Sequence, residues 1–231
     1  MSVINLQKEM LEKVAIALGN DLVKTMVFVG GCTTGLLVTD EFTKEQIRYT
    51  DDVDLIVDIM GYAAWTDLQE QLKVKGFSID MGEEVMCRMI LDNLKVDFMP
   101  IDEQALGFTN IWYKGAVETA QDYALNDALT IKLITPEYFV ATKLEAYLGR
   151  GDGDALSSHD IEDLLNIFDG RGSIVDDILS ASVDLKKYVS EQLKSLMADG
   201  NFEYAVQATA RNDSDREQLI FERIEGCIAN D

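Results

Sequence analysis

The fold of this chain is decided by residues 26–58, which read MVFVGGCTTGLLVTDEFTKEQIRYTDDVDLIVD. The stretch opens with an apolar run, Met26–Val29, which meets two glycines and continues into a second apolar segment. A short apolar run that ends at glycine is typical of a buried strand, and the apolar continuation predicts the start of a helix. After the polar residues 39–50, the run 53–59 predicts a second strand.

Helical and strand patterns continue on both sides of this stretch. Apolar residues recur at helical spacing over residues 3–19. Alternating apolar and polar residues predict a hairpin of strands 85–91 and 94–99, joined by Asp92-Asn93, whose side chains tolerate positive φ. Further expected elements are a strand over 129–134 and helices over 62–75, 136–149, 158–169, 173–181, 184–198 and 214–228.

Together these elements predict an α+β fold in two domains. Residues 1–134 are expected to form a mixed β-sheet with flanking helices. Residues 135–231 are expected to form a helical C-terminal domain, because no strand pattern follows residue 134.

The composition is that of a globular and strongly acidic protein. Of the 231 residues, 47% are hydrophobic, and 42 Asp and Glu against 20 Lys and Arg give a net charge of −22. Extended DNA binding needs many Lys and Arg that replace counterions on phosphates, so this charge excludes it and leaves only a local basic groove open. Three scattered cysteines and one histidine exclude a disulfide framework and a zinc site. With no apolar run of membrane-spanning length, we expect a cytoplasmic protein that does not bind membranes.

Two aspartates at the start of the second strand are the strongest candidates for chemistry. Asp52 and Asp54 are two residues apart in Asp52-Val53-Asp54, so they point to the same face of a strand. Two carboxylates that close repel unless a cation lies between them, and Mg²⁺ prefers such oxygen ligands. Asp97 would add a third carboxylate if its strand is a neighbour. The alternative for the pair alone is a solvated strand edge, which is frequent in so acidic a chain.

Two further groups of residues are candidates for phosphate binding. The turn at Gly30-Gly31, followed by Cys32 and Thr33, lets backbone N–H groups approach a phosphate, although it is neither a P-loop nor a dinucleotide-binding motif. The alternative is a tight strand-to-helix turn.

The second group consists of Lys143, Arg150 and Asp160. Lys143 and Arg150 are seven residues apart on an expected helix, so they share a face that would suit a triphosphate. The alternatives are a solvated lysine and a capping box, Ser157-x-x-Asp160, at the start of the next helix.

The order of these pieces resembles the nucleotidyltransferases of the polymerase β superfamily. Their signature is a strand ending in Gly-Gly or Gly-Ser, a helix, a strand with Asp-x-Asp and a later strand with one acid, which Asp97 matches here. Residues 48–55, RYTDDVDL, are similar to the Arg-x-Ser/Thr-x-Asp-x-Asp-Leu pattern of the AbiEii-type branch. That branch also has a lysine on a later helix and an Asp soon after, matched by residues 141–146 and 158–164. The resemblance covers about residues 26–170.

The resemblance implies a fold, a reaction and a set of site residues. It implies a nucleotidyltransferase-like sheet domain and two Mg²⁺ ions, or alternatively Mn²⁺, held by Asp52 and Asp54. Asp97 would complete the shell of one metal or accept the proton of the attacking hydroxyl. An NTP would be the substrate, and its nucleoside monophosphate would move to an acceptor hydroxyl. The implied nucleotide-binding residues are Gly30, Gly31, Thr33, Arg48, Thr50, Lys143 and Arg150, and Asp160 would orient Lys143 or the acceptor.

The acceptor stays open between two classes. Many AbiEii-type members are toxins of toxin–antitoxin pairs that transfer nucleotides to RNA, so the resemblance implies an RNA or tRNA acceptor and an antitoxin partner. The charge of −22 fits a small acceptor, such as an antibiotic or a metabolite, better. A third alternative is a catalytically inactive nucleotidyltransferase fold that serves as a binding module.

Overall fold

The computed structural model describes residues 2–79, 85–150 and 153–228. The chain divides into two compact units: unit 1 is Met1–Thr33 with Arg48–Thr135, and unit 2 is Thr34–Ile47 with Pro136–Asp231. This division differs from a single boundary after residue 134, because residues 34–47 group with the C-terminal helices.

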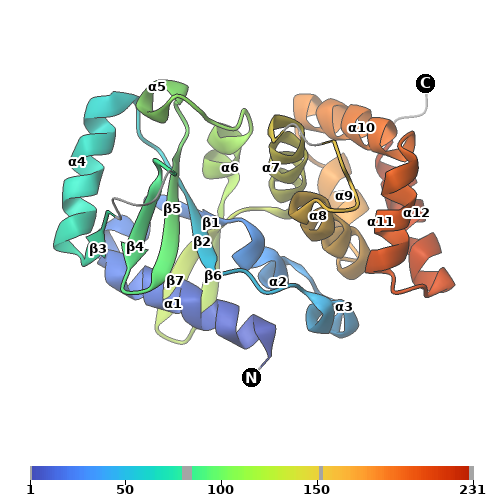
Figure 1. Cartoon of the computed structure of the whole chain (residues 1–231), viewed down its shortest axis with the longest axis horizontal. Coiled ribbons are helices and arrows are strands. Elements are labelled where there is room, and N and C mark those ends of the chain that lie inside the picture. The colour runs from blue at the N-terminus through green and yellow to red at the C-terminus, as the bar shows by residue number, and fades with distance from the viewer. Residues whose placement is uncertain (1, 80–84, 151–152, 229–231) are drawn as a thin grey trace. The chain divides into compact units, whose positions relative to one another are not determined.

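Unit 1 is built on a mixed sheet with the strand order β3-β4-β5-β2-β1-β7-β6 among the described residues (Figure 1). The strands are β1 (Met26–Val29), β2 (Asp52–Val57), β3 (Phe77–Ser78), β4 (Arg88–Leu91), β5 (Leu94–Pro100), β6 (Gln121–Asn126) and β7 (Leu129–Leu133). In the centre, β2 runs antiparallel to β1 and parallel to β5. All four residues of β1 are buried, as expected for a central strand that is covered on both faces.

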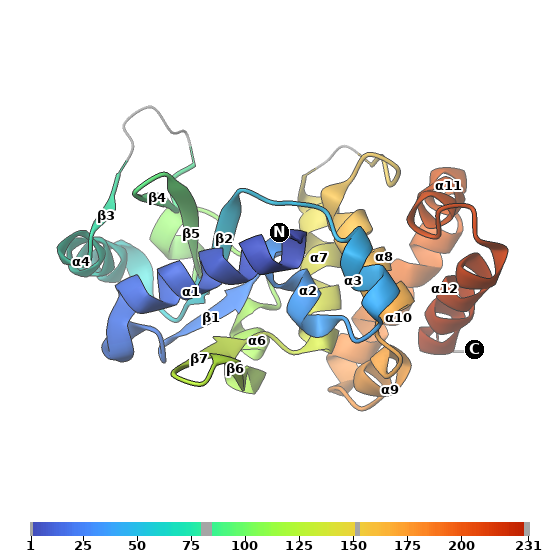
Figure 2. The same cartoon turned by 90° about the horizontal axis from the view of Figure 1, so that it is seen from below.

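The helices of unit 1 bury their apolar stripes against this sheet. They are α1 (Val3–Leu22), the 3₁₀ turn η1 (Gly31–Thr33), α4 (Gly61–Val74), α5 (Glu103–Leu106) and α6 (Tyr113–Thr119). Helix α1 contacts β2 and β7 and runs along the sheet (Figure 2), where it buries Leu11, Val14 and Leu18. Its expected end at Gly19 is instead a kink with φ of 70°, after which the helix continues to Leu22.

Unit 2 is helical, and several of its helices pack around one central helix, α8 (His159–Gly170). Its helices are α2 (Thr34–Leu37), α3 (Glu41–Gln46), α7 (Pro136–Gly149), α8 (His159–Gly170), α9 (Ile174–Leu179), α10 (Val183–Met197), α11 (Gly200–Thr209) and α12 (Ser214–Cys227). Helix α8 contacts α2, α3, α7, α11 and α12, which is why nearly all of its residues are buried. None of the described helices has both the length and the apolar character needed to cross a membrane.

A polar network holds the separate segment 34–47 in unit 2. Arg216 on α12 donates to Asp169 on α8 at 2.5 Å, to Thr43 on α3 at 2.7 Å and to Asp40 at 3.1 Å. Close packing adds to this network, because a Cβ on Gly170 would lie 2.5 Å from a methyl group of Val38. Charged hydrogen bonds and tight packing over such sequence distances fix α3 on the central helix.

Several sequence-based expectations need correction. The elements α3, β3, α5, α6, β6 and α11 were not expected, and the strand expected over 85–91 begins only at Arg88. The helix expected from Cys32 is a 3₁₀ turn followed by the single turn α2. The Ser157-x-x-Asp160 capping box is wrong, because Ser158 is the N-cap of α8 and its Oγ accepts from the Ile161 amide.

Candidate active site

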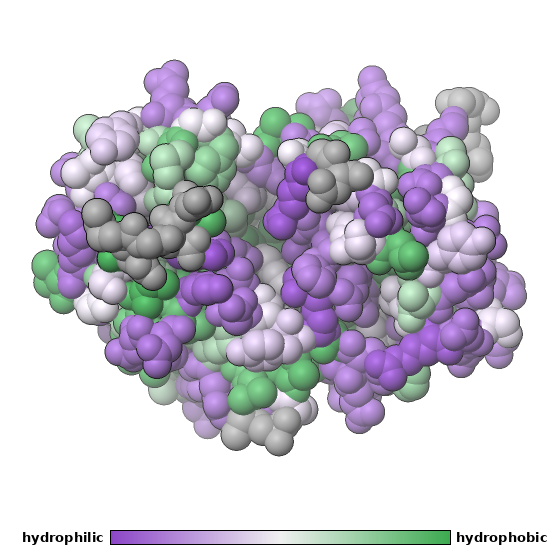
Figure 3. Space-filling model, in the orientation of Figure 1, coloured by the Kyte–Doolittle hydropathy of each residue, from purple (hydrophilic) through white to green (hydrophobic). Residues whose placement is uncertain are grey.

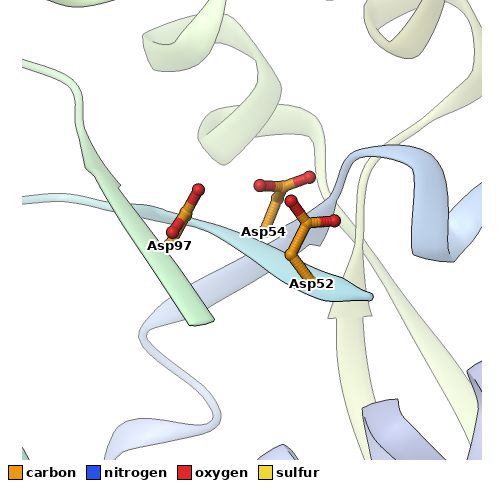
Figure 4. Close-up of side chains that lie close together, drawn as sticks. All are labelled: Asp52, Asp54 and Asp97. Atoms are coloured by element: carbon orange, nitrogen blue, oxygen red, sulfur yellow. The ribbon is translucent and has the colours of Figure 1, made fainter. Parts of the chain in front are cut away.

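Three carboxylates converge on one side of the sheet of unit 1. Asp52 and Asp54 project from β2 and Asp97 from β5, and Figure 4 shows them pointing to the same side. The parallel register places Asp54 directly opposite Asp97. One carboxylate oxygen from each residue lies within 4.8 Å of the others. The structure thus brings together the three acids that the sequence singled out, which we call the acidic cluster.

Neighbouring side chains hold the acidic cluster in place. The Thr50 hydroxyl donates to Oδ1 of Asp52. Arg88, at the start of β4, donates from Nε to Oδ1 of Asp97 at 2.7 Å and from Nη2 to Oδ2 at 2.8 Å. The same Nη2 lies 3.6 Å from Oδ2 of Asp52. Arg88 is therefore a cation already placed among the carboxylates.

The glycine turn borders Asp54 directly. Val29 pairs with Asp54 across β1 and β2, and the chain then turns at Gly30 with φ of 73°. A Cβ at Gly30 would overlap Oδ2 of Asp54, so glycine is required here both by conformation and by space. The turn and the acidic cluster are therefore parts of one site.

Replacing Gly30 by Ala is expected to cost about 2–4 kcal/mol of stability, since strain at positive φ adds to overpacking against Asp54. Gly61→Ala is the matched control, because Gly61 has φ of 75° with nothing within 4 Å of its added Cβ, and about 1 kcal/mol is expected. Urea unfolding followed by the fluorescence of Trp65 and Trp112, both in unit 1, measures the difference. Equal costs at the two glycines would contradict the close contact with Asp54.

The other sequence-predicted residues of unit 1 shape the surroundings of the turn. Thr33 is fully buried, and its hydroxyl donates to the Gly30 carbonyl at 2.8 Å, so it closes the turn. The carbonyl of Arg48 accepts from the buried side chain of Gln7 at 3.0 Å, which ties the approach to β2 onto α1. Contact of Thr33, Arg48 or Thr50 with a nucleotide stays a prediction.

Two buried thiols lie close to the acidic cluster. Burial, together with the charges of Asp54 and Asp52, raises the pKa of Cys32 well above its usual value. Burial and the charges of Asp97 and Asp54 raise the pKa of Cys87 to about 12. Both thiols therefore stay neutral at physiological pH, and the negative charge here comes from carboxylates alone.

The remaining predicted residues meet in unit 2. Lys143 on α7, only 9% exposed, places its Nζ 2.7 Å from Oδ2 of Asp163 and 3.2 Å from Oδ1 of Asp160. Arg150 reaches the other oxygen of Asp160 at 3.0 Å, while its own side chain is 70% exposed. The sequence predicts that Lys143 and Arg150 share a face that suits a triphosphate, but both cations instead contact acids of α8, because this central helix presents Asp160 and Asp163 to α7.

The sequence analysis did not identify Arg88 and Asp163 as parts of these two groups, although the sequence contained a signal for each. The two-residue turn at Asp92-Asn93 fixes the hairpin register, which pairs Leu91 with Leu94 and Arg88 with Asp97. Asp163 follows Asp160 by three residues and so lies on the same face of α8.

Comparison with other proteins adds no assignment. The sequence matches no protein-family model and no curated protein. A functional proposal therefore depends on the geometry of the acidic cluster and on the motif resemblance.

Proposed function

We propose that this protein is a metal-dependent nucleotidyltransferase with a nucleotidyltransferase-like unit 1, which moves a nucleoside monophosphate from an NTP to an acceptor hydroxyl. The observation that carries the proposal is the convergence of Asp52, Asp54 and Asp97 beside the glycine turn. Glycine turn, Asp-x-Asp strand and single-acid strand occur in the order of the polymerase β superfamily, and β1, β2 and β5 are adjacent in the sheet.

The residues of the acidic cluster fit a divalent cation in donor type and in charge. Carboxylate oxygens are the ligands that Mg²⁺ and Mn²⁺ prefer. The three carboxylates carry more negative charge than the guanidinium of Arg88 balances, and a divalent ion that takes the place of Arg88 would supply more positive charge. Asp52 and Asp54 would hold the metal, and Asp97 would join them once its oxygens are free of Arg88.

The chain itself contributes orientation and a fixed backbone. Bound metal would supply charge stabilisation at the attacking and leaving oxygens during in-line displacement. Thr50 fixes the rotamer of Asp52, and Gly30 keeps the backbone next to Asp54 free of a side chain. Contact of Lys143 or Arg150 with the nucleotide stays a prediction from the resemblance, and Lys143 would first have to leave Asp163.

For the acceptor, the pairing of basic residues favours a small molecule over RNA. A polynucleotide needs several unpaired cations along its phosphates. Lys143 and Arg150 both contact Asp160, and Lys187 on α10 lies 3.9 Å from Glu191. Hydrophilic side chains cover most of the face in Figure 3, in keeping with the net charge of −22.

The test is transfer of label from each α-labelled NTP with Mg²⁺, in the presence of either total tRNA or a small-molecule extract. We expect wild-type protein to label a small molecule and Asp52→Asn/Asp54→Asn to label nothing. Label on tRNA would retain the transferase and overturn the small acceptor. If no acceptor is labelled and Mg²⁺ with NTP fails to raise the melting temperature, a non-catalytic binding module is the correct description.

A further inference from the structure

The Arg88 guanidinium makes the most specific contact in the acidic cluster. Both oxygens of Asp97 accept hydrogen bonds from it, in the parallel two-bond geometry that arginine and carboxylate form best. Neither partner is freely solvated, since the side chain of Arg88 is 14% exposed and that of Asp97 is 11% exposed. Arg88 also approaches Asp52, so it touches acids on both strands.

A guanidinium in this position and a divalent cation on the same carboxylates exclude each other. Two cations a few ångströms apart repel strongly where water is scarce. Metal binding by Asp97 therefore requires Arg88 to leave, and a permanent Arg88–Asp97 pair would remove Asp97 from the metal site.

The backbone around Arg88 allows its side chain to leave without unfolding the strand. Its neighbour Cys87 accepts from the Phe98 amide at 2.9 Å, and Arg88 itself pairs with Asp97 in the β4–β5 register. Rotation about the long arginine side chain is enough to withdraw the guanidinium while these strand contacts persist.

We propose that Arg88 is an exchangeable counter-cation, which neutralises the acidic cluster without metal and is displaced from Asp97 when a divalent cation binds. This inference rests on the proposed metal-dependent function. It assigns Arg88 as a positioning residue that keeps like charges together between metal-binding events. Metal affinity then reflects a competition between the ion and Arg88.

The test measures Mn²⁺ binding without nucleotide, by calorimetry and by the loss of the free Mn²⁺ resonance signal. Arg88→Gln is expected to bind Mn²⁺ at least about tenfold more tightly than wild type, which corresponds to about 1.4 kcal/mol. Unchanged or weaker binding would overturn the proposal, because it would make Arg88 a fixed support for Asp97. Asp54→Asn should abolish Mn²⁺ binding both in the wild-type protein and in Arg88→Gln, which would locate the ion at the acidic cluster.

A matched control separates displacement from the simple loss of a nearby positive charge. Lys95 lies on β5 and contacts Asp51 at 3.0 Å, outside the acidic cluster. Lys95→Gln is expected to tighten Mn²⁺ binding by less than about threefold, because the charges of exposed pairs are screened by solvent. Equal effects of Lys95→Gln and Arg88→Gln would overturn displacement.

Three further outcomes are distinguishable. If Arg88→Gln fails to fold, Arg88→Lys keeps the charge but loses the two-bond geometry, and an affinity above that of wild type is still expected. If the Mn²⁺ results are as expected but no acceptor is labelled, the transferase proposal fails and the exchange stands. If Asp54→Asn binds Mn²⁺ as wild type does, the acidic cluster is not the metal site and both proposals fail.

Discussion

Replacing Asp54 by Asn is expected to lower nucleotide transfer roughly a thousandfold. Asp54 is the acid that touches the glycine turn and lies opposite Asp97, so its loss removes a metal ligand at the centre of the acidic cluster. Charge stabilisation by a bound metal contributes several kcal/mol to a reaction, and about 4 kcal/mol corresponds to this factor. Initial rates of label transfer at saturating NTP and Mg²⁺ measure the effect.

Stability distinguishes this loss of activity from unfolding. Asp54→Asn removes one of three repelling carboxylates, so the melting temperature without metal should equal or exceed that of wild type. Asp58→Asn is the matched control, because Asp58 directly follows β2 and is exposed. Asp58→Asn should leave the rate of nucleotide transfer within about twofold of wild type, because substitutions of exposed residues usually have small effects. Wild-type activity in Asp54→Asn would remove the acidic cluster from catalysis.

Replacing Lys143 by Met is expected to destabilise unit 2 by about 3–5 kcal/mol. The substitution leaves the carboxylate of Asp163, which is fully buried, without the ammonium group that lies 2.7 Å away. Far-UV circular dichroism in urea, which follows the helices of both units, measures the loss against wild type. Lys187→Met is the control, since Lys187 is exposed on α10, and a change below about 0.5 kcal/mol is expected there.

A double variant checks that the cost comes from the loss of the Lys143–Asp163 ion pair. Lys143→Met/Asp163→Asn removes both charges, so it should recover part of the loss, although Asp160 keeps its contact with Arg150. The cost of Asp163→Asn alone is measured as well. If the cost of the double variant equals the sum of the two single costs, the two residues do not interact, and packing of the Lys143 side chain explains its burial.

The sequence predicted the centre of unit 1 because local pattern and tertiary environment agree there. Met26–Val29 is apolar throughout and is buried throughout, and the hairpin turn at Asp92-Asn93 has the positive φ, 55° at Asp92, that its residue types favour. Asp52 and Asp54 are separated by the strand period, so their common face followed from the sequence alone.

Elements held by distant partners were not predictable in this way. Helix α3 has one buried residue, Thr43, and depends on Arg216, which lies 173 residues later in the chain. Strand β6 buries only one of its six residues, so its sequence lacks the apolar alternation of a strand. Lys143 looked like a solvated cation because only the packing of α7 on α8 reveals the acids around it.

The discontinuity of unit 2 sets the order in which the chain can fold during synthesis. Residues 34–47 are synthesised before residues 48–135, which form the second segment of unit 1. Their partners Asp169 and Arg216 are synthesised only after that segment. Unit 1 can therefore fold before the partners of Asp40 and Thr43 in unit 2 have been synthesised. No continuous fragment contains unit 2 alone, because residues 48–135 of unit 1 separate its two segments along the chain.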